Sequence, residues 1–455
     1  MRVRPRSRFA FALALAAAPA VLFPSVPAAE SADFRKTIAA AKAKVFPALI
    51  YVAPVVEEFS GGKREKREQG GSGVIIAPEG YAVTNWHVVE KAVAIRVLLF
   101  DGSWTTAEKV GEDRETDVGL LKLAPIPGAD RFPHAELGDS SKLEDGEFVL
   151  AMGAPWGLSR SVSLGIISST RRYLPGRSEY SLWLQTDASI NPGNSGGPLV
   201  DTNGLVIGLN TLAASSGGDL GFAVPSNTVR RIADSLVRYK EVRRSWTGLR
   251  LQPLRDFDRA IFFEGAEGVV VASVDRGSPA ARAGFRTGDL ILRVGETAVA
   301  GIAYEDLPAI QTLLGDLPLD REVPIAVRRE GKELMIGLTP RAKGKVEGED
   351  FELKEWNMTV KAINEFESPA LYFFVKEGVY VQGVRSPGNA SQAGLRRNDI
   401  LVRVEGKEVR TIEALQEVYK EAVENPAREK KVAIEILRNG LTYHMVLDYS
   451  TRYKD

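Results

Sequence analysis

The sequence contains no cysteine, and only three of its 455 residues are histidine. The absence of cysteine excludes disulfide cross-links, thiolate catalysis and every cysteine-ligated zinc or iron–sulfur centre. Lysine plus arginine equals aspartate plus glutamate, at 59 residues each. Because the chain has no excess of positive charge, it lacks the attraction that dominates nucleic-acid affinity, and we expect no nucleic-acid partner.

Long hydrophobic runs are also missing, apart from one at the N-terminus. Basic residues from Arg2 to Arg8 precede an apolar run from Phe9 to Phe23, and small residues follow up to Ala28. This three-part pattern predicts a secretory signal peptide over residues 1–28, and therefore a periplasmic or cell-envelope protein. Pro19 interrupts the run and Pro24 ends it, which argues against a membrane-spanning helix. If the signal stays uncleaved, it would tether the protein to the outer face of the membrane.

The chain is too long for one hydrophobic core, and its length predicts about three domains. Between Val45 and Val224, short apolar runs bounded by glycine, proline and aspartate predict antiparallel β-barrels. Helical spacing precedes this region in Phe34 to Val45 and follows it in Arg231 to Tyr239. The polar, glycine-rich stretch from Ser60 to Gly71 predicts a mobile surface loop. We assign residues 29–240 to this β-rich domain.

A different kind of module occurs twice in the C-terminal half. The motifs Glu-Gly-Val, Ala-Gly and Asp-Leu-Ile of Glu267 to Val294 return, with small changes, in Glu377 to Val404, always 110 residues later. A constant offset indicates an internal repeat. We assign residues 245–340 and 353–450 to two related domains. The charged segment 341–352 lacks apolar periodicity and is the predicted linker between them.

The densest glycine cluster surrounds one serine, in the segment Asn191-Pro192-Gly193-Asn194-Ser195-Gly196-Gly197-Pro198. Glycines permit a tight turn that can direct the backbone N–H groups of Gly193 and Ser195 at one point, as a developing oxyanion requires. A glycine-rich turn whose serine only faces solvent has the same features. Ser195 is therefore a candidate nucleophile if the chain also supplies a base.

The scarcity of histidine narrows the choice of base to His87, His134 and His444. His87 closes a strand-like segment, where its side chain can face a cleft, whereas the other two lie in a loop and in the last strand of the second repeat. Asp117 stands directly before an apolar strand and could orient His87, although an aspartate that only starts a turn looks the same. The order His, Asp, Ser, with each residue at the edge of a strand, matches the trypsin-type triad.

The serine segment also fits the Gly-x-Ser-x-Gly turn of α/β-hydrolases, which is the competing interpretation. Those enzymes place the histidine after the serine and the aspartate. In this chain only His444 follows Ser195, and the alternation of strands and helices that such a fold requires is missing. We therefore reject this interpretation.

Beyond the triad, the region from Val45 to Asn227 resembles the HtrA (Do-like) family of serine proteases. Besides the serine loop, the matching segments are Thr84-Asn85-Trp86-His87-Val88-Val89, Thr116-Asp117, Gly153-Ala154-Pro155, Gly165-Ile166-Ile167-Ser168, Gln185-Thr186-Asp187-Ala188 and Gly221-Phe222-Ala223-Val224-Pro225. The two repeats resemble the PDZ domains that follow the protease in that family. Two departures do not touch the chemistry: Gly119 stands where the family more often has alanine, and the loop from Val56 to Gly71 is short.

The resemblance implies a mainly β fold, in which a trypsin-like double β-barrel carries His87 and Asp117 on the first barrel and Ser195 on the second, followed by two PDZ domains. It implies an endopeptidase that needs no cofactor or metal and degrades unfolded or damaged envelope proteins. A homotrimer, or a larger homo-oligomer, is also what the family implies. The rival hypothesis is a protein that mainly binds or chaperones other chains through its PDZ domains, but an intact triad argues against that as the sole role.

Two further sets of residues are candidates for binding a peptide terminus and the substrate of the protease. Thr247, Gly248 and Leu249 resemble the PDZ loop that holds the terminal carboxylate of a peptide, while the second repeat has Asn357 where the family usually has glycine. Ile190, Asn210 and Thr211 are the residues expected to contact the substrate beside the nucleophile. Because no acid other than Asp187 is near, we expect an apolar pocket of modest size.

Overall fold

The structure, a computed structural model, describes residues 33–453 except 127, 129–130, 156–159, 214–219 and 257–266. The predicted signal peptide lies outside the described residues. Helix α1 (Phe34–Val45) forms where helical spacing predicted it, and a short 3₁₀ helix leads from it into the first strand. Within the described part of the chain, no helix combines the length and apolar character needed to cross a membrane.

The first barrel closes through a pairing between its first and last strands. The sheet order is β2-β1-β3-β4-β7-β6-β5, and β1 also pairs with β5. The strands are β1 (Leu49–Ser60), β2 (Lys63–Glu68), β3 (Gly71–Ile75), β4 (Tyr81–Thr84), β5 (Ala92–Leu98), β6 (Trp104–Asp113) and β7 (Val118–Leu123). Only β2 lies outside the closed ring, as an extension of β1.

The second barrel has the order β10-β13-β12-β11-β8-β9 and is closed. Its strands are β8 (Phe148–Gly153), β9 (Ser161–Arg172), β10 (Trp183–Thr186), β11 (Pro198–Asp201), β12 (Val206–Ala213) and β13 (Gly221–Pro225). Helix α3 (Ser226–Tyr239) follows and packs its apolar face, with Val229, Ile232, Ala233 and Leu236, into a core that both barrels share. The predicted mainly β fold with a double barrel is confirmed.

The stretch from Ser60 to Gly71 forms a hairpin, so the prediction of a mobile loop was wrong. Val55 to Ser60 pair in register with Lys63 to Glu68. Gly61 and Gly62 have φ angles of 57° and 81°, and positive φ at both turn residues is what a two-residue hairpin requires. A Cβ on Gly62 would lie 2.3 Å from the backbone nitrogen of Arg385, so the hairpin tip rests against the C-terminal repeat. This contact anchors the tip of the hairpin, while most of the charged residues of β2 stay exposed to solvent.

The first repeat, here called the first module, has the sheet order β15-β16-β17-β19-β20, with β18 on β17. Its elements are β15 (Leu249–Gln252), β16 (Val269–Val274), α4 (Pro279–Ala283), β17 (Leu290–Val294), β18 (Thr297–Ala298), α5 (Leu307–Gly315), β19 (Val323–Arg329) and β20 (Lys332–Leu338). The chain enters and leaves it through two paired strands, β14 (Ser245–Trp246) and β21 (Arg341–Ala342). The module has a hydrophobic core of its own.

The second repeat, here called the second module, follows the same order with one strand added, β22-β23-β24-β25-β27-β28, and β26 on β25. Its elements are β22 (Asp350–Leu353), β23 (Met358–Ala362), α6 (Pro369–Phe374), β24 (Val379–Val384), α7 (Asn389–Gln392), β25 (Ile400–Val404), β26 (Lys407–Glu408), α8 (Ile412–Glu424), β27 (Lys431–Arg438) and β28 (Leu441–Asp448). Strands β21 and β22 thus lie in or at the edges of the segment predicted as a linker.

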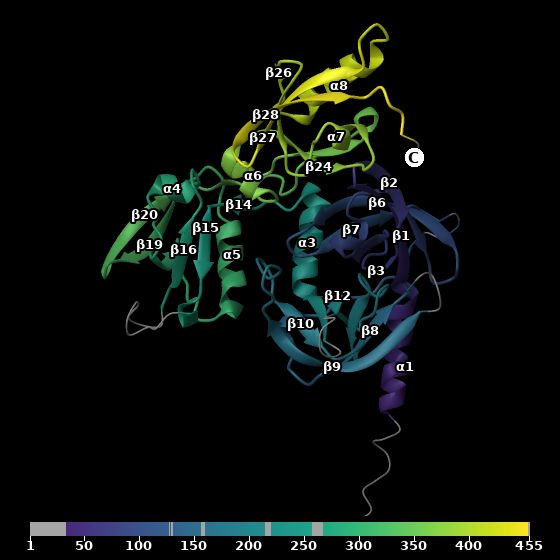
Figure 1. Ribbon diagram of the computed structural model, residues 1–455. Coiled ribbons are helices and arrows are strands. Elements are labelled where there is room, and N and C mark those ends of the chain that lie inside the picture. The colour runs from purple at the N-terminus through teal and green to yellow at the C-terminus, as the bar shows by residue number, and fades with distance from the viewer. Residues whose placement is uncertain are drawn as a thin grey trace, which may run out of the picture.

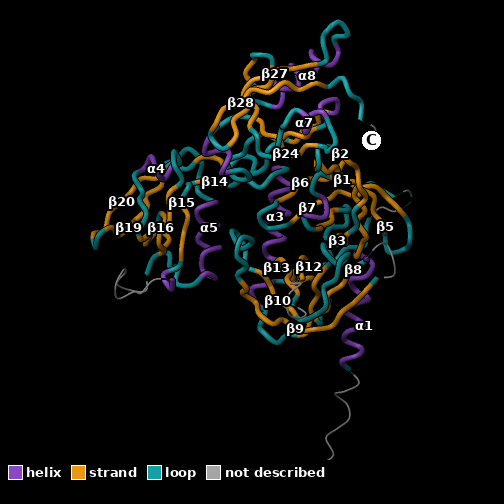
Figure 2. The backbone as a smooth tube through the Cα atoms, viewed as in Figure 1, coloured by secondary structure: helices purple, strands orange, loops and turns teal. Residues whose placement is uncertain are grey.

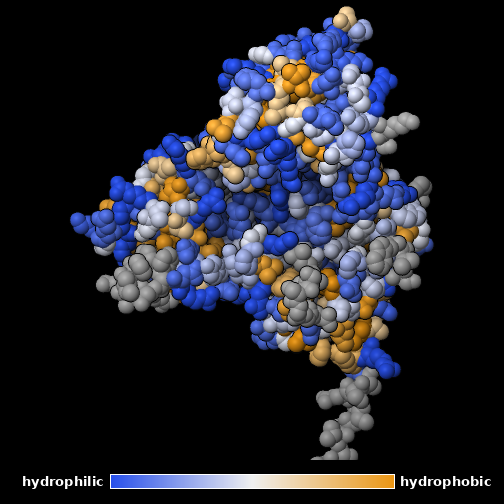
Figure 3. All heavy atoms as spheres, in the orientation of Figure 1, coloured by the Kyte–Doolittle hydropathy of each residue, from blue (hydrophilic) through white to orange (hydrophobic). Residues whose placement is uncertain are grey.

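The two modules and the double barrel surround a central space. Figure 1 shows the first module beside the barrels, with α5 on the side that faces α3, and the second module above both. The trace of strands and helices in Figure 2 gives the same arrangement. In Figure 3 hydrophilic residues surround the hollow at the centre of the face in view.

Candidate active site

The three predicted catalytic residues lie in turns at the ends of strands. His87 lies on the one-turn helix α2 (Trp86–Val89) after β4, and Asp117 directly precedes β7. Because β4 and β7 are paired neighbours in the first barrel, the two residues come together. Ser195 lies before β11 in the second barrel. The arrangement therefore brings residues of both barrels to the boundary between them.

The Asp117 carboxylate accepts hydrogen bonds from both the ring and the backbone of His87. Nδ1 of His87 lies 3.0 Å from Oδ1 and 2.9 Å from Oδ2 of Asp117, and the His87 N–H donates to Oδ1 at 3.1 Å. The Asp117 side chain is 9% exposed and the His87 side chain 34% exposed. A carboxylate can only accept, so Nδ1 carries the proton and Nε2 is the ring nitrogen that can receive one.

The Ser195 hydroxyl is directed at a backbone carbonyl. It donates to the oxygen of Thr211 at 3.1 Å. Within the described residues, no hydrogen bond joins this hydroxyl to the His87 ring. Catalytic hydrogen bonds are often long or absent before substrate binds, so the arrangement is compatible with a resting enzyme.

The turn around Ser195 depends on glycine at two positions. Gly193 has φ 98°, and a Cβ there would lie 2.6 Å from the Cβ of Pro155; Gly196 has φ 84°, and a Cβ there would lie 2.1 Å from the oxygen of Ser72. In the described part of the chain, no hydrogen bond occupies the N–H groups of Gly193 and Ser195. Both donors are therefore available to an oxyanion.

Two buried polar residues that the sequence analysis did not select hold the site together. Ser72 Oγ donates to the oxygen of Gly193 at 2.7 Å and accepts from the N–H of Ala154 at 2.8 Å, and the Ser72 N–H donates to the oxygen of Ser195 at 2.8 Å. Asn85 Nδ2 donates to the oxygen of Asp117 at 3.0 Å and to Oγ1 of Thr211 at 2.8 Å. Each residue therefore links the first barrel to the second.

The predicted substrate-contacting residues lie deeper than expected. Asn210 is fully buried, and its Nδ2 donates at 3.1 Å to the carbonyls of Met152 and Pro198, so its side chain joins β12 to β8 and β11. Ile190 is 6% exposed and packs in the core of the second barrel. Thr211 contributes its carbonyl to Ser195, as described above. Asp187 Oδ1 accepts from the N–H of Ile166 at 2.7 Å.

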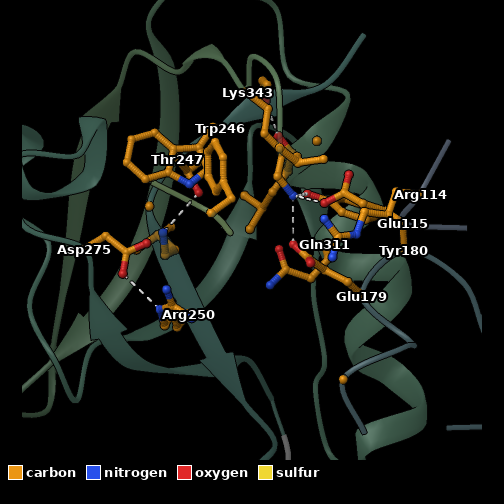
Figure 4. Close-up of a pocket in the computed structure, with 18 of the residues that line it drawn as sticks. Arg114, Glu115, Glu179, Tyr180, Trp246, Thr247, Arg250, Asp275, Gln311 and Lys343 are labelled. Atoms are coloured by element: carbon orange, nitrogen blue, oxygen red, sulfur yellow. Dashed lines mark hydrogen bonds and ion pairs between the residues drawn. The ribbon is translucent and has the colours of Figure 1, made fainter. Parts of the chain in front are cut away.

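The predicted carboxylate loop of the first module is a tight turn beside an open cavity. Gly248 has φ 78°, and a Cβ there would lie 2.1 Å from that of Ser278. Thr247 Oγ1 accepts from the N–H of Leu249 at 3.3 Å, whereas no hydrogen bond within the described residues occupies the N–H of Gly248. Thr247, Gly248 and Leu249 line a cavity of about 820 Å³ (Figure 4), which extends along β15 and α5 and reaches Trp86 and Asp117.

Comparisons with known proteins follow the same division of the chain. Residues 71–209 match the trypsin-like peptidase domain family and residues 236–339 match the PDZ domain family. The chain is 36% identical over 396 residues to a probable periplasmic serine endoprotease DegP-like of Halomonas elongata, over 85% of this chain and 80% of that protein. The chain belongs to the DegP-like family of serine endoproteases. It is also 31% identical over 402 residues to the periplasmic serine endoprotease DegP of Escherichia coli, over 85% of this chain and 78% of that protein.

Solved structures of similar proteins support the same family assignment. The HtrA-type protease AlgW with a tripeptide aligns at a TM-score of 0.60 with 34% identity, over 68% of this chain and 97% of that chain. This DegP-like chain is thus a serine endopeptidase with a trypsin-like domain and a PDZ domain in its first module, which confirms the predicted enzyme class over the scaffold hypothesis. Its relatives are named periplasmic endoproteases, which supports a periplasmic or envelope location. Among the described residues, no group of three or more histidine, aspartate or glutamate side chains could hold a metal.

A buried ionic cluster joins the DegP-like protease domain to the two ends of the first module. Arg244 donates to both carboxylate oxygens of Asp113 at 2.7 Å and lies 3.1 Å from Glu115, while Lys343 contacts Glu115 and donates to the Tyr180 hydroxyl at 2.9 Å. Figure 4 shows Lys343, Glu115, Tyr180 and Glu179 together at one wall of the cavity. Burial raises the pKa of the Asp113 carboxyl, but hydrogen bonds and charge from Arg244 outweigh it, so this pKa is lowered.

Replacing Ser72 with alanine is expected to lower kcat of this DegP-like protease by about tenfold or more and its stability by about 1–3 kcal/mol. The substitution leaves the buried Ala154 N–H without its acceptor and frees the Gly193 carbonyl, so the turn around Ser195 loses its anchor. Hydrolysis of a quenched fluorescent peptide and thermal unfolding measure the two effects. Ser141→Ala removes a hydroxyl from an exposed turn and is the matched control. Equal kinetics of the two variants would show that Ser72 does not position the turn.

Proposed function

We propose that this endopeptidase cleaves unfolded or damaged polypeptides of the cell envelope, with Ser195 as nucleophile, His87 as general base and Asp117 as the residue that orients it. The contact between the His87 ring and both oxygens of Asp117, beside a serine turn with two unoccupied N–H groups, carries the proposal. The Gly193 and Ser195 amides would form the oxyanion hole. No cofactor takes part.

The proposed reaction begins with a change at Ser195. Its hydroxyl leaves the Thr211 carbonyl and turns to Nε2 of His87, which accepts the proton as Ser195 Oγ attacks the scissile carbonyl. Asp117 stabilises the imidazolium that forms, and His87 then donates the proton to the leaving amine. Water then attacks the carbonyl of the acyl-enzyme while His87 accepts its proton. His87 returns that proton to Ser195 Oγ as the new carboxyl end of the substrate leaves, which restores Ser195.

The remaining assignments support this function. We propose that residues 1–28 are the export signal, that residues 29–240 form the protease domain, and that the chain acts as a homotrimer or larger homo-oligomer. We further propose that residues 245–340 bind peptide C-termini through Thr247, Gly248 and Leu249. Residues 353–450 form the second PDZ domain in this proposal, after the linker 341–352, because the two modules share a sheet order and a repeat offset.

Cleavage of a denatured protein tests the proposed activity and its specificity. We expect cuts after small or medium aliphatic residues such as valine, isoleucine, alanine and leucine, because Asp187, the acid nearest in sequence to Ile190, accepts a hydrogen bond from the Ile166 N–H. Mass spectrometry of the fragments gives the cut sites, and the folded form of the same protein is the control. A majority of cuts after lysine or arginine would show that an acidic group reaches the pocket and would contradict this specificity.

Binding of peptides to the first module has a separate test. Gly248→Glu is expected to weaken the binding of a decapeptide with a free, apolar C-terminus by about tenfold or more, because it adds bulk and negative charge where the carboxylate docks. Calorimetry on the Ser195→Ala chain measures the affinity, with the C-terminally amidated peptide as the ligand control. Gly288→Glu, which also has positive φ but faces open space, is the matched variant. Equal affinities of both variants would reject the loop assignment.

A further inference from the structure

The two modules differ at one edge of otherwise equivalent sheets. In the first module β15 ends the sheet, whereas in the second module the equivalent strand β23 has β22 on its outer side. The equivalence of β15 and β23 is fixed by register, since Leu249 pairs with Val274 and Met358 pairs with Val384 at corresponding ends. The outer edge of this strand is where a PDZ domain adds a peptide as an extra strand.

The added strand has the direction and position of a bound peptide. Strand β22 runs antiparallel to β23, with Asp350 opposite Lys361 and Leu353 opposite Met358. It then enters the loop before β23, where Asn357 has φ 56° in the place of Gly248, whose φ is 78°. Backbone groups of β23 that a ligand would pair with are therefore already paired with the chain itself.

Side chains of β22 also fill the groove between β23 and the helix. The Phe351 ring packs edge-on against Tyr419 of α8 with ring centroids 6.4 Å apart, and Leu353 is fully buried in the core. The Tyr419 hydroxyl accepts from the N–H of Glu355 in the loop at 3.1 Å. In the first module the equivalent groove, between Leu251 of β15 and Gln311 of α5, opens into the 820 Å³ cavity.

We propose that residues 350–353 are a built-in ligand of the second module, so that each chain binds one peptide terminus, at the first module only. The proposal rests on the proposed peptide-binding function of the first module. An attached strand competes at an effective concentration in the millimolar range, which excludes a free peptide of ordinary PDZ affinity. The second module thus binds a strand of its own chain at the sheet edge where the first module binds a peptide.

Contacts with the protease domain hold this strand in place. Lys91 Nζ lies 2.7 Å from Asp350, the Arg64 N–H donates to Glu352 at 3.0 Å, and Arg114 pairs with Glu347 at 2.6 Å just before the strand. The Asp350 side chain is 8% exposed, so its contact with Lys91 is well shielded from solvent. The internal ligand therefore also connects the second module to the first barrel.

Calorimetry and hydrogen exchange on the full Ser195→Ala chain test the proposal with the decapeptide described above. We expect one peptide per chain, binding that Gly248→Glu weakens by about tenfold or more, and slower exchange at residues 249–252 on peptide addition. Residues 358–361 should be protected equally with and without peptide. Two peptides per chain, or peptide-dependent protection of residues 358–361, would overturn the proposal. Failure of any peptide to bind would refute the proposed function of the first module. Protection of residues 358–361 in the peptide-free chain would still show whether β22 covers β23.

Shortening one side chain of the internal ligand supplies a second test. Phe351→Ala removes the ring that contacts Tyr419 and is expected to speed exchange at residues 358–361 by about tenfold and to create a second, weaker peptide site. Phe373→Ala, which removes a 71% exposed ring of the same module, is the matched control. If Phe351→Ala unfolds the module, hydrogen exchange at residues 358–361 of the Ser195→Ala chain, with and without peptide, still tests the proposal. Unchanged protection at residues 358–361 in a folded Phe351→Ala chain would count against β22 as the ligand.

Discussion

Replacing Ser195 with alanine is expected to lower kcat/KM for an unfolded protein by at least about 10³-fold, because the proposed nucleophile is lost while the oxyanion donors remain. The variant should keep its fold, since the one hydrogen bond that this hydroxyl makes to the described residues is the bond to the Thr211 carbonyl. Release of soluble fragments from casein measures the activity, and circular dichroism measures the fold.

Ser103→Ala, which removes a hydroxyl from an exposed turn of the first barrel, is the control and should retain full activity. Activity of Ser195→Ala near that of the control would reject the triad. The same variant measures any binding of unfolded chains that does not depend on cleavage, so it separates proteolysis from a holding role.

Replacing Arg244 with methionine is expected to destabilise the protein by about 3–5 kcal/mol, because it leaves the Asp113 carboxylate buried without its partner. Both side chains are 6% exposed, so solvent cannot replace the lost contact. The change should also reduce kcat, since Asp113 ends β6 and directly precedes the turn that ends at Asp117. Thermal unfolding and peptide hydrolysis measure the two effects.

The neighbouring Arg243 supplies a matched control. Its partner is Glu241, and both side chains are more than half exposed, so Arg243→Met should change stability by less than about 1 kcal/mol. Replacing Asp113 by leucine together with Arg244→Met should restore much of the lost stability, because the apolar pair removes the unpaired Asp113 carboxylate while Glu115 keeps its contact with Lys343. Similar losses in the single and double variants would show that the ion pair is not the cause.

Local patterns were enough to predict where the residues of the proposed triad lie in the fold. The glycine-rich turn, the strand that ends at His87 and the aspartate before an apolar strand each depend on a few neighbouring residues. Ser72 and Asn85 could not be found in this way, because their roles arise from contacts across the two barrels. A small polar residue inside an apolar strand, as in Gly71 to Ile75, is the one signal that could have pointed to Ser72.

Contacts between domains explain the errors. The hairpin from Ser60 to Gly71 looked like a loop because its second strand is charged, but that strand pairs with β1 and the hairpin tip rests against the second module. The repeat predicted two equivalent modules, but β22 lies in a charged segment that shows no repeat partner. A strand of four residues gives too short a pattern to distinguish from a linker.

The place where the first module joins the rest of the chain has an evolutionary consequence. Ser245 and Trp246 pair with Ala342 and Arg341, and the Lys343 N–H donates to the Arg244 carbonyl at 2.9 Å, so the chain departs and returns at a single point. In topological terms the module is an insertion in a hairpin. Its loss, or its exchange for another domain, would leave the protease and the second module joined through a short turn, with the strand that fills the second groove still in position. Such a site tolerates recombination between related genes because both breakpoints already lie side by side.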